Sequence, residues 1–282
     1  MDSVTRQQSS PSLARPAQAV VPPAHHHSLI RRAAGKSLIA AVLIATVIAW
    51  EIYTRVSDVP NYLIPAPESI LDSFTTRPRV VVDAFFTTFL ESLLGFLAAA
   101  AAGILLAIVI ARSALMERLL YPYLNIIRVT PVIAIAPLLT IWFGHGKVPM
   151  VIVAALIAFF PIVVTTALGL KSVDPDLMSL MRLLNASKSQ TLFKIQLPNA
   201  LPYIFSAFRI SAPLAVIGAL VGEFVGASEG LGYLLVTARG RIDTSTVFLM
   251  TVLAAMLGVV AFALVVAFER RFVKWHPSVQ LQ

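Results

Sequence analysis

The chain has 282 residues, of which 58% are apolar and 13% charged, and its mean hydropathy of +0.84 is typical of a protein dissolved in lipid. This composition all but excludes a water-soluble enzyme, and the absence of cysteine excludes disulfides, thiolate metal sites and thiol nucleophiles. The formal net charge is +8, so the positions of the basic residues must distinguish a nucleic-acid-binding protein from a membrane protein.

The first segment, residues 1–35, is rich in Ser, Pro, Ala and Gln and contains the run His25–His27. Such a segment cannot bury enough apolar surface to offset its ordering entropy, so we expect a disordered cytoplasmic tail. A signal peptide is not expected, because no small-residue cleavage site follows the first apolar run. The histidines are expected to be solvated, with loose metal binding as the alternative.

Six segments of the remaining chain, residues 36–282, are apolar over the roughly 20 residues that a helix needs to cross the hydrocarbon. The first contains Glu51 near its end, and the fifth contains Arg209. The predicted spans are 37–55, 83–111, 126–144, 148–170, 199–222 and 245–268. We therefore predict an all-α polytopic membrane protein with six transmembrane helices.

Lys and Arg are distributed unevenly between the two sides of this predicted bundle. With the N-terminus in the cytoplasm, 15 lie on the cytoplasmic side, six lie outside and Arg209 lies within a span. The positive-inside rule then puts both termini in the cytoplasm. This bias accounts for the basic charge, so no nucleic-acid partner is expected.

Two of the predicted spans carry features beyond length and hydropathy. Small residues at every fourth position of the second span predict a smooth stripe for close helix packing. They are Gly95, Ala99, Gly103 and Ala107. Pro131, Pro137 and Pro161 lie at membrane depth and are expected to kink the third and fourth spans.

The segment between spans four and five, about residues 175–190, is too long and too polar for a minimal turn. Apolar residues at helical spacing predict a short amphipathic helix. They are Leu177, Leu180, Met181 and Leu184. Asn185 tolerates a left-handed turn and Ser187 is placed to cap a second helix. The segment is either a cytoplasmic projection for a partner to grip or a plain interfacial helix.

This segment resembles the signature loop of the permease subunits of ATP-binding-cassette (ABC) importers, which reads roughly Glu-Ala-Ala, three residues, Gly, with Leu-Pro following. The residues that correspond to the loop are Ser179, Leu180, Met181, Arg182, Leu183, Leu184, Asn185, Ala186 and Ser187, and Leu197-Pro198 follows. Ser179 stands where the family has Glu, and Asn185 stands where it has Gly.

The resemblance extends from about residue 37 to the end of the chain. The stretches 59–67, 130–138 and 230–233 resemble the nitrate, sulfonate and taurine branch of the family. The stretch 223–227 is closer to permeases for thiamine pyrimidine precursors and riboflavin-like compounds.

The resemblance implies a type I importer permease bundle in the bacterial inner membrane, without catalytic residues, metal or cofactor. It implies a separate cytoplasmic ATPase that grips residues 175–190, an extracytoplasmic binding protein that delivers a small polar or anionic nutrient, and a second permease copy. The ATPase-coupling residues would be Ser179, Leu180, Met181, Arg182, Leu184, Asn185, Ala186 and Ser187. Gly35-Lys36-Ser37 matches only the end of a phosphate-binding loop, so this chain is not expected to hydrolyse ATP.

Ionisable residues within spans are costly to keep there and are therefore candidates for a translocation path or gate. They are Glu91, Arg209 and Glu223. Arg209, expected near mid-depth, either attracts an anionic substrate or forms an internal ion pair, and Glu91 approaches it from the opposite side. Glu223 is a gate, a contact for the binding protein or an interfacial charge.

Two other function classes compete with the importer. A self-sufficient ion-coupled secondary transporter would use Glu91 as its deep acidic residue, but the chain has no visible internal repeat. A membrane enzyme is the weakest alternative, because the five histidines are too dispersed to converge on one site.

Overall fold

The computed structural model describes residues 27–57 and 59–272, and every regular element in this part of the chain is helical. The helices are α1 (His27–Val56), α2 (Pro67–Thr76), α3 (Pro78–Arg112), α4 (Ala114–Val129), α5 (Val132–Phe143), α6 (Lys147–Lys171), α7 (Pro175–Leu183), α8 (Lys188–Thr191), α9 (Leu197–Gly226), α10 (Leu231–Gly240) and α11 (Thr244–Phe272). A π-helical turn, Leu192–Gln196, joins α8 to α9. The predicted all-α class is confirmed for these residues.

The chain divides into two units, residues 1–49 and 50–282. In the first unit, α1 already begins at His27, ahead of the predicted membrane domain. It starts only after the last proline of the predicted tail, Pro23, because proline interrupts a helix. Residues 1–26 of that tail, which include two of its three histidines, lie outside the described residues.

Four helical runs of the described chain are long and apolar enough to cross a membrane: α3, α6, α11 and the continuous run Lys188–Gly226. Helices α4 and α5 are long and apolar enough to cross a membrane only when they are taken together, and the chain bends by 92° between them. These elements correspond to the predicted second to sixth spans, and the observed helices extend beyond most of the predicted bounds.

The predicted third span, 126–144, is not one helix, because the chain breaks at Thr130–Pro131. The backbone of both residues is extended there, with ψ of 125° at Thr130 and 101° at Pro131. Proline supplies no N–H to the helical ladder, and its ring disfavours a helical conformation at the preceding residue. Pro137 and Pro161, by contrast, lie inside the continuous helices α5 and α6. The chain therefore breaks completely at Pro131, whereas the helices continue through Pro137 and Pro161.

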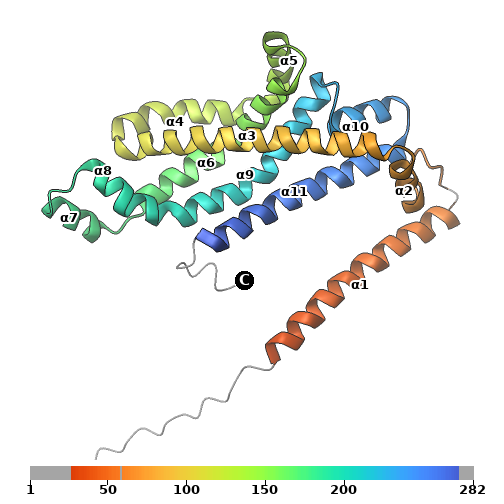
Figure 1. Ribbon diagram of the computed structural model, residues 1–282, viewed down its shortest axis with the longest axis horizontal. Helices are drawn as coiled ribbons and strands as arrows, with labels where there is room; N and C mark the ends of the chain where they lie inside the picture. Colours follow the sequence, from red (N-terminus) through yellow and green to blue (C-terminus); the bar gives the residue numbers. More distant parts are fainter. Residues whose placement is uncertain (1–26, 58, 273–282) are drawn as a thin grey trace, which may run out of the picture. The chain divides into compact units, whose positions relative to one another are not determined.

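The core of the second unit is α6, which packs between α3 and α9 (Figure 1). Ala154 of α6 is fully buried, and a Cβ added to Gly95 of α3 would lie only 2.5 Å from its Cβ. A Cβ added to Gly218 of α9 would lie 2.6 Å from the Cα of Ala154. Ala99 and Ala107 of the predicted stripe are also buried, which confirms that the stripe serves helix packing.

We expect Gly218→Val to destabilise the protein by about 1–3 kcal/mol, because the added side chain must force α9 away from the backbone of α6. The matched control is Gly258→Val on α11, since a Cβ at Gly258 meets no atom within 4 Å. Thermal unfolding in detergent measures both variants. Equal unfolding temperatures would contradict the close packing at Gly218.

The two ends of the bundle differ in structure (Figure 1). At one end, α2 and α10 cover the first turns of α3 and α11 around a core that includes Val81, Leu231 and Met250. At the other end, α7 and α8 project beyond α3, α6, α9 and α11. The run Lys188–Gly226 has 39 residues and therefore measures about 58 Å, well beyond a hydrocarbon layer of about 30 Å.

Candidate functional site

The turn between α7 and α8 is held by its own backbone. Asn185 adopts a left-handed conformation with φ of 51°. The N–H of Asn185 donates to the carbonyl of Arg182 and the N–H of Ala186 donates to the carbonyl of Met181, both at 3.0 Å. This is the pair of bonds with which glycine usually ends a helix. The prediction of a left-handed turn at Asn185 is confirmed.

The start of α8 is capped by the side chain that the sequence indicates. Ser187 Oγ accepts a hydrogen bond from the N–H of Gln190 at 3.2 Å, and Gln190 Oε1 accepts one from the N–H of Ser187 at 2.8 Å. The start of α7 is capped by Asp174, whose Oδ1 accepts from the N–H of Asp176 at 2.8 Å. Because its helix ends are satisfied internally, the segment is a defined helical pair.

An exposed apolar surface lies on this helical pair, and we call it the coupling patch. Its members are Leu177, Leu180, Leu183 and Leu184, with exposed fractions of 46%, 49%, 80% and 67%. The predicted stripe omitted Leu183, because its position departs from the helical spacing of the others. Arg182 stands beside the patch and donates to Ser179 Oγ at 2.9 Å. Serine thus supplies an acceptor for this arginine where the family has a carboxylate.

The helical pair is joined directly to the membrane helices. Gln196 Nε2 donates to the carbonyl of Leu170, and Asn199 Nδ2 to the carbonyl of Gly169, both at 3.3 Å. Asn199 Nδ2 also donates to Ser172 Oγ at 3.1 Å. These bonds satisfy carbonyl groups at the end of α6, so the ends of α6 and α9 are held together. Sequence reasoning missed both side chains, because their partners lie 26 to 30 residues away.

The predicted meeting of Arg209 with Glu91 is wrong. Arg209 Nε donates to Glu269 Oε2 at 2.5 Å, and Nη2 of the same guanidinium pairs with the same oxygen. Glu269 lies in the last turn of α11. Arg209 is therefore level with the last turn of α11. The span prediction ended at residue 268, one residue before this partner.

Glu91 instead lies beside Glu223, and each residue is only 2% exposed. Thr88 Oγ1 donates to Glu223 Oε1 at 2.6 Å, and the N–H of Gly232 donates to Glu223 Oε2 at 2.5 Å. Thr88 Oγ1 also accepts from the N–H of Leu231 at 2.8 Å. Glu223 therefore caps the start of α10 and ties it to α3 and α9. Its carboxylate is buried among these helices and is not exposed on the surface of the chain.

Glycine is required beside this carboxylate. Gly230 has φ of +99°, and a Cβ there would lie 2.2 Å from Glu223 Oε1. A Cβ at Gly232 would lie 2.8 Å from the Cβ of Glu223. The two glycines are part of a motif noted in the sequence, but their partnership with Glu223 was not predicted.

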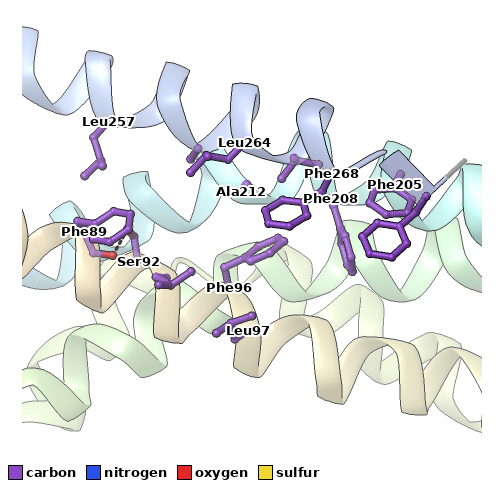
Figure 2. A pocket seen from close by; sticks show the side chains of 14 residues that line it. Phe89, Ser92, Phe96, Leu97, Phe205, Phe208, Ala212, Leu257, Leu264 and Phe268 are labelled. Atoms are coloured by element: carbon purple, nitrogen blue, oxygen red, sulfur yellow. Dashed lines mark hydrogen bonds between the residues drawn. The ribbon is translucent and has the colours of Figure 1, made fainter. Parts of the chain in front are cut away.

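A further feature within the bundle is an apolar cavity of about 430 Å³ between α3, α9 and α11 (Figure 2). Phenylalanines dominate its described lining, which includes Phe89, Phe96 and Phe208. The one polar residue in that lining is Ser92, whose hydroxyl donates to the carbonyl of Phe89 at 2.9 Å. A polar solute would therefore lose its hydration in this cavity without compensation, so the cavity does not suit one.

The chain matches a family of transport proteins over most of this bundle. The family model described as "Binding-protein-dependent transport system inner membrane component" matches residues 99–274. The chain belongs to this family. It is thus a permease subunit of an ABC importer in the inner membrane and not an enzyme. Its partners are a separate ATPase and a substrate-binding protein. The importer prediction is confirmed over the secondary transporter.

Individual relatives of the permease agree with this assignment. It is 35% identical over 236 residues to the formylaminopyrimidine transport permease protein ThiX of Halalkalibacterium halodurans, covering 82% of this chain and 92% of that protein. It is 32% identical over 245 residues to the putative aliphatic sulfonates transport permease protein SsuC of Bacillus subtilis, covering 86% and 87%. The branch predicted from the sequence motifs is confirmed.

The fold of the permease is also similar to that of solved transporters. A crystal structure of an amino acid ABC transporter with histidines aligns with a TM-score of 0.59 at 16% identity, covering 71% of this chain and 97% of that one. At this identity the likeness concerns the fold alone. It supports the overall helical fold.

Proposed function

We propose that this permease pairs with a second copy to form the translocation path of the importer, and that residues 175–190 dock on the ATPase. The observation that carries the proposal is the coupling patch, four exposed leucines on a helical pair whose ends are internally satisfied. Exposed apolar groups of this kind are expected where a protein partner covers them. The docking residues are Ser179, Leu180, Met181, Arg182, Leu184, Asn185, Ala186 and Ser187, with Leu183 added.

The connection between this segment and the membrane helices supports a rigid transmission of movement. When the ATPases close, α7 and α8 are displaced as one piece because their shared turn is bonded internally. Gln196 and Asn199 then transfer the displacement to the ends of α6 and α9. The close contact of Gly218 with Ala154 keeps these two helices together along the bundle. Alternating access would arise from rocking of whole helices.

The complete topology that we infer has six spans in a type I importer bundle, with both termini in the cytoplasm. Besides the four long runs, it requires α1 as the first span and the bent pair α4 and α5 as the third. Neither α4, with 16 residues, nor α5, with 12, reaches the roughly 20 residues needed to cross alone. The domain assignment, a tail of about 35 residues followed by a membrane domain, belongs to this proposal.

The candidate path residues divide into two groups in this mechanism. Glu91 and Glu223 form the candidate gate, because the movement of α10 depends on the bonds that Glu223 makes to Thr88 and Gly232. Arg209 is assigned a supporting role, since its guanidinium is committed to Glu269.

The transported nutrient is proposed to be a small polar or anionic compound. The relatives named for transport of formylaminopyrimidine and aliphatic sulfonates support this class. The binding protein is expected to determine selectivity within the class, because the cavity between α3, α9 and α11 offers almost no polar group.

Affinity purification from cells that co-express the genomic neighbours tests the proposed function. We expect a stoichiometric ATPase to copurify with the permease, and its hydrolysis rate to rise when loaded binding protein is added. If the permease purified alone and moved solute in vesicles under a proton or sodium gradient, the importer mechanism would be wrong. Glu91 would then be the first residue to replace.

A further inference from the structure

A second cavity, of about 410 Å³, lies at the end of the bundle where α2, α3, α10 and α11 meet. We propose that it binds the oxyanion group of a small molecule, namely a sulfonate, phosphate or carboxylate. Its volume lies within the range of small-molecule sites in proteins. It is separate from the coupling patch, which lies at the opposite end of the bundle (Figure 1).

The cavity combines an apolar floor with polar walls. Val81, Ala238 and Met250 line it and are buried, with exposed fractions of 4%, 5% and 0%. Hydroxyl groups come from three of the four helices. They belong to Ser73, Thr76, Tyr233, Thr237 and Thr246. An apolar base with polar groups in the walls is the usual composition of a small-molecule site.

The charged groups of the cavity are not paired with one another. Arg77 and Arg241 both line it, and within the described residues neither forms an ion pair. Asp243 is already occupied, since its two carboxylate oxygens accept from the N–H and the hydroxyl of Thr246 at 3.1 and 2.7 Å. Asp72 is the remaining acidic group in the lining. The two arginines and two aspartates of the lining carry no net charge together, and Arg77 and Arg241 are the charged groups that can donate hydrogen bonds to a ligand.

This arrangement selects the chemistry of the ligand. Guanidinium groups bind oxyanions through paired, charge-assisted hydrogen bonds, so Arg77 and Arg241 provide donors for an oxyanion although the lining as a whole is electrically neutral. Asp72 would receive an amino group if the ligand carries one. A free solute and a phospholipid headgroup can both present an oxyanion. A headgroup could reach the cavity because it lies at helix ends, where headgroups meet a membrane protein.

Ligand-observed NMR on the delipidated full chain in detergent, with methanesulfonate as the probe, tests the site. Neither ATPase nor binding protein is present, so the result does not depend on the importer mechanism. We expect saturable binding that becomes at least tenfold weaker in a variant combining Arg77→Gln with Arg241→Gln. The matched control is Arg79→Gln, because Arg79 is exposed but does not line the cavity. It should bind the probe like the unmodified chain.

A second variant and a competition experiment complete the test. Thr237→Phe fills the cavity without changing its charge, and we expect it also to weaken binding. A short-chain phosphatidylglycerol that displaces methanesulfonate identifies the headgroup as the source of the oxyanion, whereas a lack of displacement identifies a free solute. The site is overturned if the unmodified chain shows no saturable binding, or if the double arginine variant binds the probe as well as the Arg79→Gln control.

Discussion

Changing Arg182 to Glu and Leu184 to Asp in one variant should abolish transport by preventing association with the ATPase. Leu184 is 67% exposed in the isolated chain, and burying a leucine in an interface contributes roughly 1.5–3 kcal/mol. Reversing the charge of Arg182 adds an unpaired charge at the same surface. The two changes together should therefore cost more than about 3 kcal/mol of binding free energy, which weakens the affinity for the ATPase by a factor above 100. Copurification of the ATPase and uptake of substrate in cells measure the effect.

The control for this variant keeps both properties of the surface. Arg182→Lys with Leu184→Met retains the charge and the apolar contact, and we expect the ATPase to copurify with it. Both proteins should insert into the membrane equally, because the two positions are exposed and their side chains do not support the core. Undiminished transport in the charge-reversed variant would refute the role of residues 175–190.

Replacing Glu269 with Ala should be the most damaging change inside the bundle. It leaves the guanidinium of Arg209 without its partner, although that side chain is only 22% exposed. Removing one member of a buried ion pair typically lowers the free energy of unfolding by about 3–5 kcal/mol. Because Arg209 is partly exposed, we expect a loss of about 3 kcal/mol. We expect a lower unfolding temperature and a lower yield of folded protein in detergent.

The double variant Arg209→Met with Glu269→Leu provides the matched comparison. It replaces both charged side chains with apolar side chains of similar length, so it should recover most of the stability that Glu269→Ala loses. The alternative function of Arg209, attraction of an anionic substrate, gives a different result. In that case the double variant would be stable, yet its substrate concentration for half-maximal transport would rise sharply.

The parts of the structure that were predictable depend on local chemistry. Asn185 and Ser187 act on neighbours within four residues, so their backbone roles follow from residue type and position. Span positions follow from apolar runs whose length is set by the bilayer. In the same way, the stripe at every fourth residue of α3 specifies a packing face without specifying its partner.

The parts that were not predictable depend on distant contacts. Pro131 and Pro161 occupy similar apolar surroundings in the sequence, yet only Pro131 ends a helix, because neighbouring helices determine whether a missing hydrogen bond is tolerated. Arg209 meets a carboxylate 60 residues away, just past the end of the predicted span. Glu223 caps a helix that was not predicted as an element, so its burial had no signal in a single sequence.

The attachment of α10 by Glu223 has a consequence for the ion barrier of the membrane. Its bonds to Thr88 and Gly232 fasten α10 to both α3 and α9, so α10 cannot swing outward as an independent flap. Opening this end then requires displacement of long helices, a slow and costly event without nucleotide. We therefore expect the resting importer to leak few ions between transport cycles, which preserves the membrane potential of the cell.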